Sequence, residues 1–187
     1  MRSPFLAAAA AAAILALVPA AASGAAPSLP KPKSTAVKPN VGMGGVRLGQ
    51  KARPREPGWR RPFKCMELDG MSGCVWTTRR DALPPAGQMG ISGPFAMQMG
   101  RGRVEGLILS SGTRDTDPGP VRRWKTRKGI GFTSTLEQFV AAYPAAKLNA
   151  STGSYSLLAR GNITTFVFAG GTLNTIEMYT CEAYEDC

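Results

Sequence analysis

Two segments of the chain alternate apolar and polar residues on either side of a glycine turn. They read MQMGRGRVEGLIL (97–109) and FVFAGGTLNTIEM (166–178), and residue 97 aligns with residue 166 at an offset of 69 that stays constant to the end of both segments. The turns fall at Arg101-Gly102 and Gly170-Gly171. Alternation of period two around such a turn predicts a β-hairpin with one buried face. The pattern therefore predicts two related hairpins.

In this alignment two methionines of the first hairpin match phenylalanines of the second. Met97 corresponds to Phe166, and Met99 corresponds to Phe168. Thioether sulfurs can bind Cu(I), but the phenylalanine counterparts bind no metal. Both methionines are therefore predicted to pack in the core.

One segment has the periodicity of a helix. In TSTLEQFVAAYP (133–144), four apolar residues from Leu136 to Tyr143 form a stripe, and Pro144 ends it. Thr133 or Ser134 is predicted to cap this helix. If Ser134 is the cap, Glu137 completes a capping box.

A glycine-rich loop, GIG (129–131), precedes the helix. Loops of this kind can cradle phosphates at a helix N-terminus. This one lacks both the Lys-Ser/Thr pair that ends a P-loop and the third glycine of a dinucleotide loop. It is predicted to lead the chain into the helix and not to bind a nucleotide.

Antiparallel hairpins with one or two helices predict an α+β fold. The second helix is left open, because the matching place in the first half, residues 50–61, contains two prolines and no apolar stripe. The domain is predicted to span 41–187, with 41–112 and 126–187 as candidate units. Residues 27–40 hold four prolines and three lysines and are predicted to form a flexible leader.

The N-terminus has the composition of a secretory signal peptide. Arg2 precedes an apolar run, LAAAAAAAILALV (6–18), and small residues follow it. The run is shorter than the ~20 residues that a membrane-spanning helix needs. Residues 1–26 are therefore predicted to be removed, which leaves an exported protein with no transmembrane anchor.

The four cysteines are predicted to form two disulfides, because an even number in an exported chain favours disulfides over metal ligation. Asp69-Gly70 predicts a type I′ turn, and counting outward from it pairs Cys65 with Cys74. That pair falls at a non-hydrogen-bonded position, where antiparallel strands lie closest. By elimination, Cys181 pairs with Cys187.

Composition argues against most catalytic chemistry. The chain has no histidine, so it lacks the usual general base and the commonest metal ligand. Asp115 and Asp117 lie in a Pro-Gly loop, where turn formation is favoured over Ca²⁺ binding, and three more carboxylates crowd the C-terminus, Glu182, Glu185 and Asp186. Whether any of these acids converge is left open. The chain is predicted to be non-enzymatic and to use no cofactor or metal.

The net charge of +11 points to an anionic partner. Two basic clusters contain aromatic residues, RPREPGWRRPFK (53–64) and RRWKTRK (122–128). The predicted binding residues are Arg122, Arg123, Trp124, Lys125, Arg127 and Lys128. In an exported protein, such a cluster favours an anionic envelope polymer or lipid headgroups over nucleic acid. A solvated surface without a ligand is the alternative reading.

Several motifs carry a family resemblance. They are GVRLGQ (45–50), GRGRVEGLIL (100–109), RWKTRKGIGFTSTLEQFVAAYP (123–144) and TTFVFAGGTLNTIEM (164–178). Their order resembles small secreted bacterial proteins of unknown function whose pattern is similar to tandem helix-plus-hairpin modules, as in the beta-lactamase inhibitor protein and the small outer-membrane assembly lipoproteins. The resemblance implies a concave sheet that is presented to another protein, such as a secreted enzyme. It specifies no catalytic or binding residue.

Overall fold

The structure is a computed structural model that describes residues 29–53, 59, 62, 64–68, 71–76, 94–111, 119–182 and 187. The predicted signal peptide lies outside these residues, as do Asp69-Gly70, Asp115, Asp117, Glu185 and Asp186. In the part of the chain that the structure describes, no helix is long and apolar enough to span a membrane.

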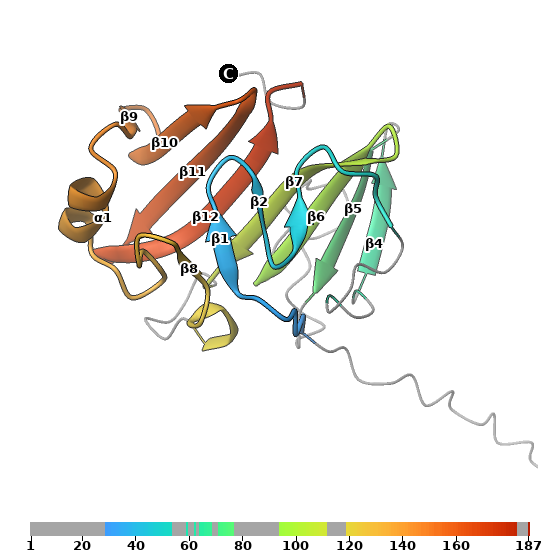
Figure 1. Cartoon of the computed structure of the whole chain (residues 1–187), viewed down its shortest axis with the longest axis horizontal. Helices are drawn as coiled ribbons and strands as arrows, with labels where there is room; N and C mark the ends of the chain where they lie inside the picture. The colour runs from blue at the N-terminus through green and yellow to red at the C-terminus, as the bar shows by residue number, and fades with distance from the viewer. Residues whose placement is uncertain are drawn as a thin grey trace, which may run out of the picture.

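The larger of two sheets has eight strands, all paired antiparallel, in the order β4-β5-β6-β7-β12-β11-β10-β9 (Figure 1). The strands are β4 (Lys64–Leu68), β5 (Met71–Trp76), β6 (Phe95–Gly100), β7 (Arg103–Ser110), β9 (Lys147–Asn149), β10 (Ser154–Ala159), β11 (Asn162–Ala169) and β12 (Thr172–Thr180).

The smaller sheet has four short strands in the order β3-β2-β1-β8. These are β1 (Ala36–Lys38), β2 (Gly42–Met43), β3 (Val46–Arg47) and β8 (Lys125–Thr126). The helical segments of the described chain are α1 (Leu136–Ala142) and a 3₁₀ turn, η2 (Gly119–Val121).

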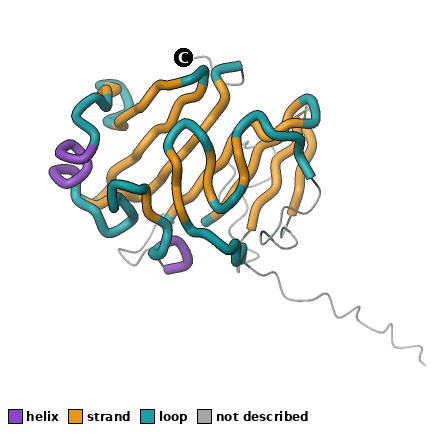
Figure 2. The backbone as a smooth tube through the Cα atoms, viewed as in Figure 1, coloured by secondary structure: helices purple, strands orange, loops and turns teal. Residues whose placement is uncertain are grey.

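The α+β prediction is wrong, because the fold is essentially all-β (Figure 2). The single α-helix of the described residues has seven residues. In the first half, the start of the segment that was considered for a second helix is extended instead. Val104 donates to the carbonyl of Gln50 at 2.9 Å, and Ala52 donates to the carbonyl of Gly102 at 2.8 Å. The chain therefore pairs with β7 here and does not repeat a helix-plus-hairpin module.

The two predicted hairpins, β6–β7 and β11–β12, have the same register at the offset of 69. Met97 pairs with Leu107 in the first, and Phe166 pairs with Ile176 in the second. Each hairpin also has a bulge at the equivalent place, after Gln98 and after Val167. The repeat seen in the sequence is therefore a repeat of strand pairing.

The two hairpins meet where β7 pairs with β12 at the centre of the sheet. Leu107 pairs with Met178, and Leu109 pairs with Ile176. The offset of 69 exchanges these two pairs, so the halves are related by an approximate two-fold axis. Between them, the equivalent positions Ile108 and Glu177 pair with each other.

The core lies between the two sheets. Val37, Met43 and Val46 of the smaller sheet are at most 2% exposed, and they belong to one buried cluster with residues of β6, β7 and β12. Met97 lies in this cluster and Met99 packs against it, as predicted. Burying one apolar face of each sheet against the other provides the main stabilisation of such a fold.

The folded part of the chain starts upstream of Val41, inside the segment predicted to be a flexible leader. Val37 is fully buried in β1, and Asn40 is nearly so. The Asn40 amide N–H donates to Thr164 Oγ1 at 2.7 Å, and Thr164 Oγ1 donates to Asn40 Oδ1 at 2.9 Å. These buried bonds attach the β1–β2 turn to β11, which explains why a proline- and lysine-rich segment becomes ordered.

The helix is capped by Thr135, and not by Thr133 or Ser134 as predicted. The amide N–H of Gln138 donates to Thr135 Oγ1, and the amide N–H of Thr135 donates to Gln138 Oε1, which is a capping box. Ser134 instead accepts a bond from the amide N–H of Gly131 at 3.1 Å. The predicted Ser134–Glu137 box is therefore wrong, since the Ser134 hydroxyl is used inside the preceding loop.

Both disulfides pair as predicted. Cys65 is bonded to Cys74 and Cys181 to Cys187. Cys65 and Cys74 are direct cross-strand partners with Cα atoms 4.1 Å apart, in the register that the Asp69-Gly70 turn predicted. Disulfides of this kind are typical of an oxidising, extracytoplasmic environment.

Candidate anion-binding surface

The outer face of the smaller sheet carries exposed cations. Along its strands, buried and exposed residues alternate, so Lys38 follows buried Val37 and Arg47 follows buried Val46. Lys125, exposed on β8, precedes buried Thr126. We call Lys38, Arg47 and Lys125, together with the flanking exposed Arg123 and Arg127, the basic face.

Strand pairing sets the spacing of these cations. Lys38 and Arg47 both pair with Gly42, so their backbone positions are two strand spacings apart, roughly 10 Å. Lys125 pairs with Ala36, two residues before Lys38, which is a diagonal of roughly 7–8 Å. Gly42 has no side chain to separate Lys38 from Arg47. The basic face is therefore a row of cations at intervals of roughly 7–10 Å.

The two chain segments that form the basic face contain no acid. Residues 29–53 and 119–136 hold eleven lysines and arginines and no aspartate or glutamate. Among the described residues, none of the five cations of the basic face is paired with a carboxylate. Their charges are available to a ligand.

The β8 segment is held against β1 by its backbone. The amide N–H of Lys125 donates to the carbonyl of Thr35 at 3.3 Å, and Thr35 Oγ1 donates to the carbonyl of Arg123 at 3.0 Å. Trp124 anchors the same segment from below, because its indole is 2% exposed and packs against Trp59 and Phe95. A buried ring between exposed cations fixes which way the cations point.

The glycine loop supports this segment and has no free amides for a phosphate. Gly129 donates its amide to the carbonyl of Thr126, Ile130 to Thr126 Oγ1 and Gly131 to Ser134 Oγ. Gly131 is required by close approach, because a Cβ there would lie 2.7 Å from the carbonyl oxygen of Trp124 and 2.8 Å from Lys125 Cγ. The loop therefore positions Lys125.

The structure divides the six predicted binding residues into three groups. Arg122, Arg123, Lys125 and Arg127 are exposed. Trp124 is a core residue, so it supports the surface from below and is not itself exposed. Lys128 is exposed but already engaged.

The ammonium group of Lys128 stabilises the end of α1. Its Nζ donates to the carbonyl of Ala142 at 2.5 Å and lies 4.7 Å from the centre of the Tyr143 ring. A cation at a helix C-terminus interacts favourably with the helix dipole. Burial raises the pKa of Tyr143, and a hydrogen bond with Thr126 opposes this shift, so the ring stays neutral beneath the cation. Lys128 is therefore a structural cation.

Sequence reasoning missed Lys38 and Arg47. Both lie far from residues 122–128 in the chain, and β1 and β8 pair in parallel across almost ninety positions. The available signal was local, since Val37-Lys38 and Val46-Arg47 each place an apolar residue beside a cation, as in a half-buried strand.

In the other basic cluster, Trp59 is fully buried and donates its Nε1–H to the carbonyl of Gly44.

The described residues also limit the site's chemistry. No three His, Cys, Asp or Glu side chains gather there in a way that could hold a metal ion. Comparison with protein-family models, curated proteins and solved structures finds no match. The fold and its surface therefore define the class: a disulfide-bonded, two-sheet β protein with an exposed basic face.

Proposed function

We propose that the protein is an exported, non-enzymatic binding protein that associates with anionic components of the cell envelope through the basic face. The ligand is a phosphate- or carboxylate-bearing polymer, or the headgroups of anionic lipids. The observation that supports this most directly is the row of unpaired cations on the outer face of the smaller sheet.

Charge and rigidity together favour this function. Lysine and arginine side chains bind phosphate and carboxylate groups, arginine with two hydrogen bonds at once. The row is built on paired strands that the core holds in place, so little order has to be imposed when the ligand binds. A ligand with repeated charges can contact several of these cations and release its counterions.

The test is binding to two probes, inorganic polyphosphate and vesicles of phosphatidylglycerol, with phosphatidylcholine vesicles as the neutral reference. The variant Lys38→Ala/Arg47→Ala/Lys125→Ala should bind the anionic probes about tenfold more weakly or worse, because several like charges act together on one polyanion. Preference for polyphosphate or for vesicles then identifies the source of the anionic groups.

A matched control removes the same charge elsewhere. Arg101→Asn/Lys147→Ala/Arg160→Asn deletes three exposed cations outside the basic face, and asparagine tolerates the positive φ of Arg101 and Arg160. This variant should bind nearly as well as the wild type. Equal loss in both variants would mean that only net charge matters, which would contradict a specific basic face.

A second candidate function is that of an inhibitor or partner of a secreted enzyme, bound through the larger sheet. It is favoured by Leu148 and Leu158, which are 56% and 57% exposed beside a hollow in that sheet. Apolar contacts are little affected by salt, whereas polyanion binding weakens steeply. Capture of a secreted enzyme that survives high salt and is lost in Leu148→Ser/Leu158→Ser would favour this function.

A further inference from the structure

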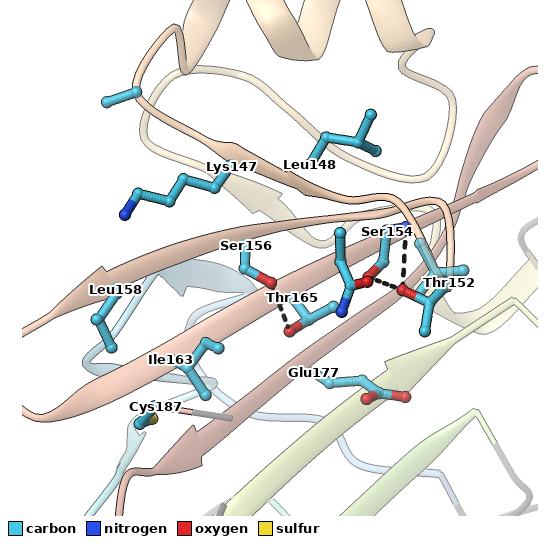
Figure 3. A pocket seen from close by; sticks show the side chains of 13 residues that line it. Lys147, Leu148, Thr152, Ser154, Ser156, Leu158, Ile163, Thr165, Glu177 and Cys187 are labelled. Atoms are coloured by element: carbon cyan, nitrogen blue, oxygen red, sulfur yellow. Dashed lines mark hydrogen bonds between the residues drawn. The ribbon is translucent and has the colours of Figure 1, made fainter. Parts of the chain in front are cut away.

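A hollow lies on the larger sheet against β9 to β12, away from the basic face. It has a volume of about 590 Å³. Its lining includes Ser156, Leu158, Ile163, Thr165 and Glu177, and also Lys147, the cross-strand partner of Ser156 on β9 (Figure 3). None of these residues belongs to the basic face, so the hollow is a separate surface.

Three oxygen-bearing side chains form a row across the floor of the hollow. Ser156 pairs with Thr165, and Thr165 pairs with Glu177, so the three lie on neighbouring strands β10, β11 and β12. The hydroxyls of Ser156 and Thr165 are 3.3 Å apart and share one hydrogen bond (Figure 3). Each hydroxyl oxygen has two lone pairs. The floor therefore keeps unused acceptor capacity next to a carboxylate.

Among the residues that the structure describes, Glu177 has no counter-ion. It is mostly buried near the centre of the sheet, and no described residue donates a hydrogen bond to its carboxylate or forms an ion pair with it. Burial alone raises the pKa of this carboxyl group. A partly buried carboxylate without a partner costs folding free energy.

The fold does not require a carboxylate at this position. The repeat-related residue in the first half is Ile108, which pairs directly with Glu177. An apolar side chain therefore fills the same place in the other hairpin. Glu177 is a charge added to one half of a repeated structure.

Apolar groups lie beside the row of acceptors. Ile163 is 6% exposed and forms part of the wall, whereas Leu158 is 57% exposed and extends from β10 beside it (Figure 3). A ligand in the hollow could therefore contact hydrogen-bond acceptors with one end and apolar side chains with the other. This arrangement suits a cation on an aliphatic stem.

We propose that the hollow binds a primary alkylammonium group, with Glu177 as its counter-ion. The hydroxyl oxygens of Ser156 and Thr165 accept the remaining N–H bonds, and the aliphatic stem packs on Leu158 and Ile163. An ammonium group has three donors and no acceptor, which matches a row of three acceptor side chains. A guanidinium is a planar fork that matches one carboxylate edge, so the row favours the ammonium.

The same chemistry occurs in a free alkylamine and in a lysine side chain. Three probes separate these sources from simple apolar binding: pentylammonium, N-acetyl-lysine methylamide and neutral pentanol. The measurement is NMR of protein labelled at Ile and Leu methyl groups. Saturable shifts at Ile163 and Leu158 are expected with either ammonium probe, and the ratio of the two affinities identifies the source.

The variant Glu177→Gln should weaken ammonium binding about tenfold or more, because it removes the carboxylate that balances the ligand's charge and leaves Lys147, which also lines the hollow, in place. It removes a charge that partial burial disfavours, so the variant should fold, and its methyl spectrum checks this. Glu105→Gln is the matched control, since it removes one negative charge from the other half of the sheet. Equal shifts with pentanol, or unchanged affinity in Glu177→Gln, would overturn the proposal.

Discussion

At the scale of single residues, the burial of Glu177 connects its place in the sheet to the pH dependence of folding stability. Its folded-state pKa is raised by burial. A raised folded pKa means that the group contributes stability below its unfolded pKa, near 4.3, and that this contribution is lost as the pH rises through the folded value. At neutral pH the ionised carboxylate is therefore unfavourable for folding.

We expect Glu177→Gln to stabilise the protein at pH 7 by up to about 1 kcal/mol, because partial burial disfavours the charged carboxylate. For a chain of this size this raises Tm by about 2–4 °C. The difference should vanish near pH 3, where the wild-type side chain is also neutral. The strand register also places two other titratable side chains, Lys147 and Tyr179, on this face. Both are present in the wild type and in the variant, so their titration does not contribute to the difference. Thermal melts at the two pH values measure this, and a variant less stable than wild type at pH 7 would contradict it.

The cysteines were predictable from local residues alone. Asp69-Gly70 sets the register, and the register makes Cys65 and Cys74 direct partners. Thr133 or Ser134 was wrongly predicted as the helix cap because three hydroxyl residues stand in sequence, Thr133, Ser134 and Thr135, and each is a residue type that caps helices. Which one caps the helix depends on the bond from Gly131 to Ser134, and that loop geometry is not visible in the sequence.

Replacing both Cys65 and Cys74 by serine should lower the free energy of unfolding by about 2–3 kcal/mol, as expected for a loop of this length in the chain-entropy model. Denaturant unfolding measures the change. Non-reducing peptide mapping of the wild type tests the pairing itself. A linkage between Cys65 and either Cys181 or Cys187 would contradict the structure.

At the scale of elements, the glycine loop and β8 act as one unit. Gly131 allows the loop to approach Trp124 and Lys125 closely, and the nearest atom to an added Cβ is a backbone oxygen, which cannot rotate away. Gly131→Val should therefore displace β8 and destabilise the protein by about 1–3 kcal/mol. Polyphosphate binding should weaken in the folded variant, because Lys125 moves with β8. Unchanged stability would mean that the loop can move to accommodate the valine side chain, which would contradict this account.

The same loop should not bind nucleotides, because its amides are used internally. Millimolar ATP or NAD is expected to leave the Tm of the Lys38→Ala/Arg47→Ala/Lys125→Ala variant unchanged at matched ionic strength. This variant is the appropriate background, since it weakens the binding of phosphates to the basic face. A saturable rise in Tm that Gly131→Val abolishes would contradict this account of the loop.

The hairpins could be predicted from sequence, whereas the smaller sheet could not. Each predicted hairpin has six or more residues per strand, long enough for alternation to be visible. The strands of the smaller sheet have two or three residues each. Their pairing also joins Val37 to Thr126. A strand this short, paired this far along the chain, leaves no local periodicity.

At the scale of the whole molecule, the repeat was visible but the fold class was mispredicted. The offset of 69 follows from alternation and turn residues in each hairpin, and it extends to the bulges. The α+β prediction assumed that the helix at Leu136–Ala142 forms a layer that packs on the sheet. That helix is two turns long and buries Phe139, while two sheets form the layers. Layers depend on which elements pack together, and this is not a local property.

The two proposed sites lie on separate surfaces of the molecule. The outer face of the smaller sheet carries the cations of the basic face, and the hollow in the larger sheet is lined by Glu177 and Lys147 among other residues. Neither site shares a residue with the other. Substitutions in one should therefore leave the other's binding intact, since distant sites without common contacts behave additively.

The central claim is that the cations of the basic face act together on a polyanion, and the salt dependence of binding measures this most directly. Affinity for polyphosphate should be determined between about 50 and 300 mM salt, a range over which screening of exposed charges changes strongly. The plot of log affinity against log salt should fall steeply for the wild type. In Lys38→Ala/Arg47→Ala/Lys125→Ala the slope should be smaller by about 3, or about 1 for each lost contact, while Arg101→Asn/Lys147→Ala/Arg160→Asn keeps the wild-type slope. Equal slopes in all three proteins would contradict the claim.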